Sequence, residues 1–544
     1  MKKIQLSLGL IVIIILILFL HINYLRFVCD DAFISFRYAQ NLMEGHGLVY
    51  NIGERVEGYT NFLWTLLLSA FMGIGLDVVV VSQVLGILFS LSTVLLLLYF
   101  NRKLYPTESL FNYLAPLFLG CCGAYAAWST GGLETSFYTF LVFLGSFLFI
   151  RGMDQPRLFV LSGITFALVC LTRLDGLIFA GITFIWLFYL TVIKKRIEFK
   201  DLVLWTLCFL VPFLAYFIWR WSYYGRLLPN TYYVKVGGLS LYHQGLYYLF
   251  ESIRRFRLWL LIIPLVFLSR TVKSNIKLKI IIPYFVSLIS VFSLYVVYIG
   301  GDFMDMFRFF VPILSFFFFL AQEGFRGMHE YSRSFVSNQN SLNHSRRFNG
   351  IKILTKSRLA GIKNIKTIWY TVEMCLIILC ICFLVYPSRK SNKMWNWKGI
   401  DSLGLLREYS RLWSRVGLMF KDIAKPGESL STTAAGAIPF YSELYTIDEF
   451  DLTLAPVAQS ALTVKGSRPG HDNFVTDEYI VSRKPTYVLG HPKIYEEFER
   501  PQWEWVVQEP FASAGYKIET FRIRISNSEA IYVYFLSQRR FDSQ

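Results

Sequence analysis

Charged side chains are scarce in this sequence. Only 17% of the 544 residues are Asp, Glu, Lys or Arg, whereas 55% are hydrophobic and 18% are aromatic. Because soluble domains carry about 25% charged residues, the composition excludes an ordinary soluble protein. Several apolar runs exceed the roughly 18 residues that cross a bilayer. The sequence therefore predicts a polytopic, α-helical membrane protein.

Cysteine patterns that would build disulfides or metal sites are also missing. The eight cysteines all lie in or beside apolar segments, and none follows Pro387. Neither Cys121-Cys122 nor the pair Cys380 and Cys382 has the spacing of metal ligands. We expect these side chains to pack as small apolar residues, so the sequence predicts no redox chemistry.

Acidic residues are too few to balance the basic ones, and the formal net charge is +17. From Pro387 to the C-terminus, 20 Lys and Arg stand against 19 Asp and Glu, so almost all of the excess lies in the apolar part. Those basic residues lie mainly in short loops between apolar runs, as the positive-inside rule expects. The excess therefore indicates membrane topology and does not imply a nucleic-acid partner.

Apolar runs predict eleven transmembrane helices, with the N-terminus inside and the C-terminal domain outside. The first run has no small-residue cleavage site before Arg26, so we expect a retained helix. The short run from Asn61 to Gly75 is expected to lie on the membrane surface. With this topology, 23 Lys and Arg of the membrane part lie inside and 11 outside. The predicted spans are Ile4–Leu20, Val78–Phe100, Leu110–Ala126, Ser136–Ile150, Leu158–Leu171, Leu177–Ile193, Leu202–Arg220, Leu258–Ser269, Ile280–Tyr298, Phe307–Gln322 and Ile368–Tyr386.

Two domains are expected. Residues 1–386 form the transmembrane domain, with an external loop at residues 21–77 and a flexible basic cytoplasmic loop at residues 323–366. Residues 387–544 have the composition of a soluble protein and predict a small extracytoplasmic α/β domain. Its predicted strands are Ser429–Ala435, Pro485–Leu489, Tyr516–Ile525 and Ala530–Leu536, and its predicted helices are Ser402–Phe420 and Tyr495–Glu499.

The stretch from Asp30 to Trp64 is far too polar to lie in lipid, although it directly follows the first apolar run. It begins with two adjacent carboxylates, Asp30 and Asp31. Like charges repel, and this tends to raise the pKa of one carboxylate toward the range of a general base. A helix cap or a salt bridge with Arg37 is the structural alternative.

The same stretch resembles the first external loop of GT-C glycosyltransferases, with an Asp-Asp pair followed by FRYAQNL, GHGLVYN and GERVEGYTNFLW. Within that superfamily it is most similar to the terminal arabinofuranosyltransferases of actinobacterial cell walls. Further similar segments are WSTGGLET, LTRLDG, YYGRLLPNTYYVK, GGDFMDMFRFFVP and TTAAGAIPFYS. All of these segments lie outside in the predicted topology, which rests on Lys and Arg positions alone.

The resemblance implies a GT-C fold and an inverting glycosyltransferase. Such an enzyme moves a sugar, here arabinofuranose-like, from a polyprenyl-phosphate carrier to a cell-envelope glycan, lipid or protein acceptor. It also implies a multi-pass protein of the bacterial cytoplasmic membrane, with the active site and C-terminal domain extracytoplasmic.

This chemistry needs a base for the acceptor hydroxyl and cations for the leaving phosphate. By its position in the GT-C motif, Asp30 is the candidate base, with Asp31 orienting a donor or a catalytic Arg; the residues alone favour neither. Arg suits phosphate because its planar fork binds two oxygens, but an Arg at a span end often only snorkels to the interface. The candidate phosphate-binding residues are Arg173, Arg308, Arg37 and Lys235. The candidate sugar- and acceptor-binding residues are Glu57, Tyr59, Asn61, Glu134, Asp175, Asn230, Asp302 and His471.

Structural roles compete with several of these assignments. Glu57 and Glu134 can instead cap neighbouring helices, and Arg173 can form a structural pair with Asp175. No motif requires a cofactor, and the scattered carboxylates suit Mg²⁺ or Ca²⁺ only weakly. The resemblance keeps a divalent cation, Mg²⁺ or Ca²⁺, open as a cofactor, because some GT-C enzymes use one. A transporter or flippase for a lipid-linked sugar is the alternative function, but it would place ionisable groups near the bilayer midplane, whereas the acids here cluster at one face. A binding or scaffold protein would leave the polar segments of the membrane half unexplained.

Overall fold

Eight helices in the part of the chain that the structure describes are long and apolar enough to cross a membrane. The computed structural model describes residues 2–106, 109–235, 241–347, 355–454, 461–463, 473–495, 507–524 and 530–539. The eight helices coincide with eight of the predicted spans, and the chain is a multi-pass membrane protein. They are α1 (Lys2–Leu25), α4 (Val78–Leu104), α7 (Thr135–Gly152), α9 (Gly176–Phe188) continued by η2 (Tyr189–Ile193), α10 (Phe199–Tyr224), α15 (Leu278–Tyr298), η4 (Arg308–Ile313) continued by α16 (Leu314–Arg347), and α17 (Thr355–Ser391).

The three other predicted spans are short or interrupted helices, so the count of eleven stays a prediction. The first is broken at Cys122, whose backbone is extended. The second is a single helix of 16 residues, α8 (Arg157–Thr172). The third is split near Pro264, which lacks a backbone N–H. The pieces of the first and third are η1 (Leu110–Tyr113), α5 (Leu114–Cys121), α6 (Gly123–Ala127), α13 (Trp259–Ile262), η3 (Ile263–Phe267) and α14 (Leu268–Ser274).

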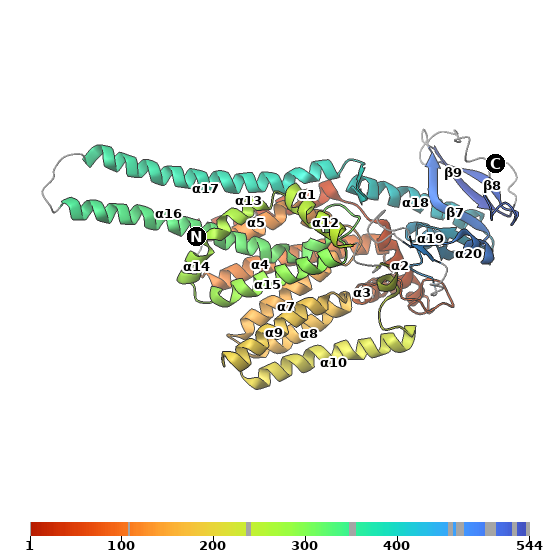
Figure 1. The fold of residues 1–544 in the computed structure, drawn as a ribbon, viewed down its shortest axis with the longest axis horizontal. Helices are drawn as coiled ribbons and strands as arrows, with labels where there is room; N and C mark the ends of the chain where they lie inside the picture. The colour runs from red at the N-terminus through yellow and green to blue at the C-terminus, as the bar shows by residue number, and fades with distance from the viewer. Residues whose placement is uncertain are drawn as a thin grey trace.

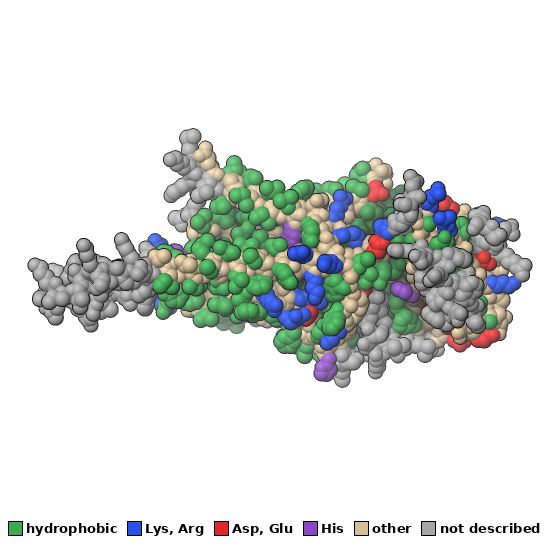
Figure 2. Space-filling view, turned by 90° about the horizontal axis from the view of Figure 1, so that it is seen from above, with side chains coloured by type: hydrophobic (Ala, Val, Ile, Leu, Met, Phe, Trp, Pro, Cys, Tyr) green, Lys and Arg blue, Asp and Glu red, His purple; other side chains and the backbone are tan. Residues whose placement is uncertain are grey.

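The helices form an elongated bundle with a sheet-containing domain at one end, and α16 and α17 extend past the bundle at the other end (Figure 1). Most residues of the α7 and α16 spans are buried, whereas most of those in α10 and α17 are not. The surface of the bundle is largely apolar, and Lys and Arg gather near its junction with the C-terminal domain (Figure 2). This division is expected when the bundle lies in lipid and its end faces water.

The C-terminal domain is built on a five-stranded mixed sheet with the order β4-β3-β7-β9-β8. β3 is parallel to β4 and β7, and β9 is antiparallel to β7 and β8. All four predicted strands are present. The domain's elements are β1 (Asn396–Trp397), β2 (Ile400–Asp401), α18 (Leu403–Ile423), β3 (Ser429–Thr432), α19 (Ala437–Ser442), β4 (Tyr445–Asp448), β5 (Ala461–Thr463), β6 (Asn473–Val475), α20 (Asp477–Ser482), β7 (Tyr487–Tyr495), β8 (Lys517–Arg524) and β9 (Ala530–Ser537).

One part of the helix prediction for this domain is wrong. Tyr495, expected to begin a helix, is the last residue of β7 and pairs with Tyr532 of β9. Tyr is a strong strand former when a partner strand lies beside it, and that partner comes from far along the chain. Residues 496–499 of the predicted helix lie outside the described residues.

Short helices fill the junction between the bundle and the C-terminal domain. α2 (Asp30–Met43) and α3 (Phe62–Gly73) follow α1 and correspond to the expected external loop. α11 (Asn230–Lys235) and α12 (Leu241–Arg255) follow α10. α2 packs against α3 and also against α18 and α19, so most of its side chains are buried. The polar stretch after α1 therefore forms the surface of the bundle against which the C-terminal domain packs.

Candidate active site

Asp30 binds the C-terminal domain through its side chain. One carboxylate oxygen accepts a hydrogen bond from the backbone N–H of Ala437 (2.8 Å), and the other accepts one from Gly436 (3.1 Å). Both donors lie at the start of α19. A Cβ at position 436 would lie 2.0 Å from the Asp30 carbonyl oxygen, so only glycine permits this close approach.

Burial raises the pKa of Asp30 to about 7. The hydrogen bond from Ala437 opposes this rise, and the charge of Asp31 adds to it. The sequence predicted a raised pKa for one member of the pair because the two carboxylates repel each other. In the structure, loss of water around Asp30 is the larger cause, and repulsion by Asp31 is a smaller one.

Asp31 has different surroundings. Its carboxylate forms no hydrogen bond or ion pair with the residues that the structure describes, and its charge attracts the buried guanidinium of Arg308. Arg308, the first residue of η4, is paired with Asp302 (2.7 Å) and lies 5.5 Å from the ring centroid of Trp128. Asp31 is thus a carboxylate without a partner that lies near a cation.

Two buried donors at this place are left without an acceptor. The Nε of Arg308 and the indole Nε1 of Trp128 have no hydrogen-bond partner among the described residues. Most buried donors in proteins are satisfied, and an unsatisfied one calls for a functional explanation. Donors on or beside a guanidinium suit an anionic oxygen such as that of a phosphate.

A second ion-pair network adjoins Arg308. Arg173, which ends α8, binds Glu134 (2.6 Å) and Asp175 (2.9 Å), and Asn61 donates a hydrogen bond to Glu134 (2.8 Å). Burial alone would raise the pKa of Glu134, but the charges of Arg173 and Arg308 hold it below its ordinary value. Seven predicted site residues are therefore linked through Arg308 and Arg173 by ion pairs, hydrogen bonds or charge: Asn61, Glu134, Arg173, Asp175, Asp302, Arg308 and Asp31.

Arg37 lies elsewhere, and each of its three guanidinium nitrogens already donates to a group of the protein. Its guanidinium donates hydrogen bonds to the backbone carbonyls of Tyr50 (2.7 Å), Leu444 (2.6 Å) and Pro439. The side chain is buried. It joins the external loop to the C-terminal domain and does not form the salt bridge with the Asp pair that the sequence offered as the structural alternative.

Three other residues that were predicted to bind sugar or acceptor contact groups that do not belong to the cluster. Glu57 forms a buried ion pair with Arg220 (2.7 Å), and Tyr59 packs on Tyr38, with ring centroids 4.6 Å apart. Asn230 donates hydrogen bonds to backbone carbonyls of the C-terminal domain. The side chain of Lys235 and the whole of His471 lie outside what the structure describes.

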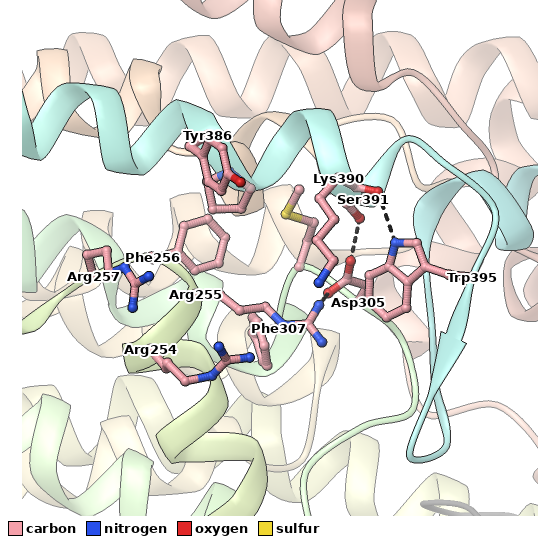
Figure 3. Close-up of a pocket in the computed structure, with 12 residues that line it drawn as sticks. Arg254, Arg255, Phe256, Arg257, Asp305, Phe307, Tyr386, Lys390, Ser391 and Trp395 are labelled. Atoms are coloured by element: carbon pink, nitrogen blue, oxygen red, sulfur yellow. Dashed lines mark hydrogen bonds and ion pairs between the residues drawn. The ribbon is translucent and has the colours of Figure 1, made fainter.

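A basic cavity beside the cluster was not predicted from the sequence. It has a volume of about 190 Å³ and lies between the end of α12 and the end of α17, against the loop that contains Asp305 and Phe307 (Figure 3). Its cations come from SIRRFRLW and PSRKSNKMW, where Lys and Arg stand near Trp beside predicted spans. That composition was the available signal, but nothing in the sequence brings the two segments together.

Two comparisons with known proteins each match part of the chain. Residues 400–534 match the family described as Domain of unknown function (DUF8728). The terminal β-(1→2)-arabinofuranosyltransferase of Mycobacterium tuberculosis is 29% identical over 259 residues, which make up 44% of this chain and 39% of that protein. The chain thus spans about two fifths of the length of this relative.

Two crystal structures of ArnT from Cupriavidus metallidurans match nearly the whole chain. The structure bound to undecaprenyl phosphate has a TM-score of 0.55 at 10% sequence identity and covers 97% of this chain and 98% of ArnT. The apo structure has a TM-score of 0.50 at 10% identity and covers 98% of both chains. The resemblance found in the sequence is confirmed at the level of fold: the chain has the GT-C fold of ArnT.

Proposed function

We propose that this protein is a GT-C glycosyltransferase that takes a sugar from a polyprenyl-phosphate carrier. One observation carries the proposal. Charged side chains from separate polar segments, Asp31 among them, act on Arg308, and the buried donors of Arg308 and Trp128 there lack an acceptor among the described residues. A free carboxylate near an unsatisfied guanidinium donor and a neutral N–H donor suits the displacement of a phosphate by a hydroxyl group.

The proposed reaction is a single displacement. Asp31 accepts the proton of the acceptor hydroxyl while that oxygen bonds to the anomeric carbon. The bond from this carbon to the carrier phosphate breaks, the phosphate leaves with the bonding electrons, and the configuration inverts. Arg308 is placed to stabilise the negative charge that develops on the leaving phosphate. Glu134 and Arg173 hold each other and are available to orient the sugar.

The pair Asp30 and Asp31 is given separate roles. The sequence motif favours Asp30 as the base, but both of its oxygens accept backbone hydrogen bonds from the C-terminal domain. The free carboxylate of Asp31 supports the opposite assignment. We therefore assign proton acceptance to Asp31 and attachment of the C-terminal domain to Asp30.

The donor and the acceptor class are proposed from similarity, and the side of the membrane from the distribution of Lys and Arg. ArnT has been crystallised with undecaprenyl phosphate, which supports a polyprenyl-phosphate donor. The Mycobacterium tuberculosis relative is an arabinofuranosyltransferase, which supports an arabinofuranose-like sugar and a cell-envelope glycan, lipid or protein acceptor. The positive-inside bias supports an active site outside the cytoplasmic membrane. Mg²⁺ or Ca²⁺ is not needed in this scheme, in which Arg308 stabilises the leaving group.

Membranes containing the protein test this function when they are supplied with radiolabelled polyprenyl-phosphate arabinose, mannose and other carriers. We expect label from one carrier to enter envelope material, and Asp31→Asn membranes to lack this transfer. Movement of labelled carrier across the membrane without sugar transfer would instead establish the flippase alternative.

A further inference from the structure

The basic cavity collects cations from two distant parts of the chain. Arg254, Arg255 and Arg257 come from the end of α12 and the residues just after it, and Lys390 comes from the last turn of α17. Figure 3 shows Lys390 reaching from α17 toward Arg255, with Trp395 beside both. Four cationic side chains in one cavity repel each other unless anions lie between them.

Only part of this charge is balanced by the protein. Arg255 binds Asp305 (2.7 Å) and Glu251 (2.7 Å), and Glu251 also binds Arg254 (2.6 Å). Arg257 and Lys390 form no ion pair with any residue in the described ranges. Two carboxylates for four cations leave an excess positive charge at the cavity. Arg257 lies over the ring of Phe383 and Lys390 over that of Trp395, so their N–H donors are not taken up by a described carboxylate and can meet a ligand.

The walls of the cavity are held firmly. Three of its residues, Arg257 (φ 49°), Met306 (φ 61°) and Phe307 (φ 49°), have left-handed backbone conformations. A non-glycine residue in this conformation is strained and persists only where its surroundings fix it. Asp305 supplies part of that support, because its side chain binds Arg255 and Ser391 and its backbone N–H donates to the carbonyl of Asp401 (3.0 Å).

Apolar surface leads from the membrane to this cavity. On α17, the turns that precede Lys390 expose Ile378, Val385 and Tyr386. Across from them, α13 contacts α17, and α13 and η3 expose Ile262 and Val266. Exposed aromatic rings near the mouth, including Tyr386, are typical of the level of lipid headgroups. The cavity therefore lies where a lipid's polar end meets its hydrocarbon chain.

We propose that this cavity binds a phosphate ester at the end of a lipid chain, with Arg257 and Lys390 as its cationic ligands and the α13–α17 surface against the chain. Phosphate fits because Arg presents a fork and Lys a point charge to its oxygens. Phe307 lines the cavity and Arg308 follows it directly, so one loop connects the cavity with the carboxylate cluster. On the basis of the proposed function, the lipid is the polyprenyl phosphate that is released after sugar transfer, so this cavity and Arg308 hold the phosphate at different stages.

Binding of undecaprenyl phosphate to the purified full-length chain in nanodiscs tests this site without sugar transfer. We expect the double variant Arg257→Gln/Lys390→Gln to bind this lipid at least tenfold more weakly than wild type. Undecaprenol, which lacks the phosphate, should bind weakly and equally to both proteins. Arg389→Gln is the matched control, because it removes one exposed positive charge beside Lys390 without touching the cavity, and it should bind like wild type.

The remaining outcomes separate the sources of the phosphate and the two proposals. Equal affinity in wild type and double variant would overturn the site, provided both elute as single species and melt at the same temperature. Inorganic phosphate that binds wild type as tightly as undecaprenyl phosphate would overturn the lipid assignment and leave a site for free phosphate. Loss of lipid binding in the variant, in a protein that transfers no sugar at all, would support the site and contradict the proposed function.

Discussion

At the scale of single residues, two adjacent carboxylates have been given different surroundings by the fold. The carboxylate of Asp30 accepts two backbone hydrogen bonds at the start of α19, whereas that of Asp31 forms no hydrogen bond with a described residue and lies near the charge of Arg308. Neighbours in a helix point about 100° apart, so one helix start can serve both the C-terminal domain and the cluster. The two residues have the same side chain, but docking of the C-terminal domain supplies hydrogen-bond donors to Asp30 only.

Asp31→Asn is therefore expected to lower turnover by roughly 10² to 10⁴, the usual contribution of a positioned base, while donor binding is retained. Asp30→Asn should keep a larger share of the turnover, because its role is to hold the domain. Turnover at saturating donor, together with donor affinity, distinguishes the two variants. A large loss in Asp30→Asn with nearly normal Asp31→Asn would return the role of base to Asp30.

The pKa of Asp30 also predicts how stability changes with pH. Its value of about 7 lies above the ordinary 3.8, so the folded protein binds this proton more tightly than the unfolded chain does. The resulting stabilisation is complete below about pH 4 and is lost as the pH rises through 7. Glu57 and Asp448 also have raised pKa values and contribute to the same slope. We expect the melting temperature of Asp30→Asn to fall less than that of wild type between pH 5 and pH 8; equal falls would contradict this.

At the scale of elements, the junction between α2 and α19 depends on a missing side chain. Gly436→Ala would place a Cβ 2.0 Å from the Asp30 carbonyl oxygen, and this backbone atom cannot move away unless the two helices separate. We expect faster amide exchange in α19 and α2, unchanged exchange in β8 and β9, and reduced turnover. Gly181→Ala is the control, since a Cβ there meets no atom within 4 Å. Unchanged exchange in α19 would show that the junction tolerates the added methyl group.

Elements differ in how far the sequence predicts them. Long apolar runs and the Asp-Asp segment were recognised because composition alone defines them. The partners of Arg37 were not, since they are backbone carbonyls at Pro439 and Leu444, and any residue type supplies a carbonyl. The basic cavity was missed for a related reason, because α12 and α17 meet only in the folded bundle. Residue type predicts what a group can do, whereas its neighbours decide whether it is free to do it.

At the scale of the whole molecule, the proposed function requires the external loop and the C-terminal domain to share one side of the membrane. Contacts between α2 and α19 require this in any orientation, and the excess of Lys and Arg in the opposite loops predicts that the side is extracytoplasmic. We expect a reporter fused after Gln544 to be active only outside the cytoplasm. We expect one inserted within residues 323–366 to be active only inside. The reverse pattern would invert the topology and with it the proposed site of reaction.

The hydrogen bonds of Asp30 to α19 join residues more than 400 positions apart in the chain. During synthesis Asp30 emerges early, but its partners appear only after every span has been made. Contacts of such long sequence separation form late in folding. We therefore expect the nascent protein to pass through a stage in which its helices are inserted while Asp30 and Arg37 still lack their partners, so that the candidate active site is completed only when the C-terminal domain has docked.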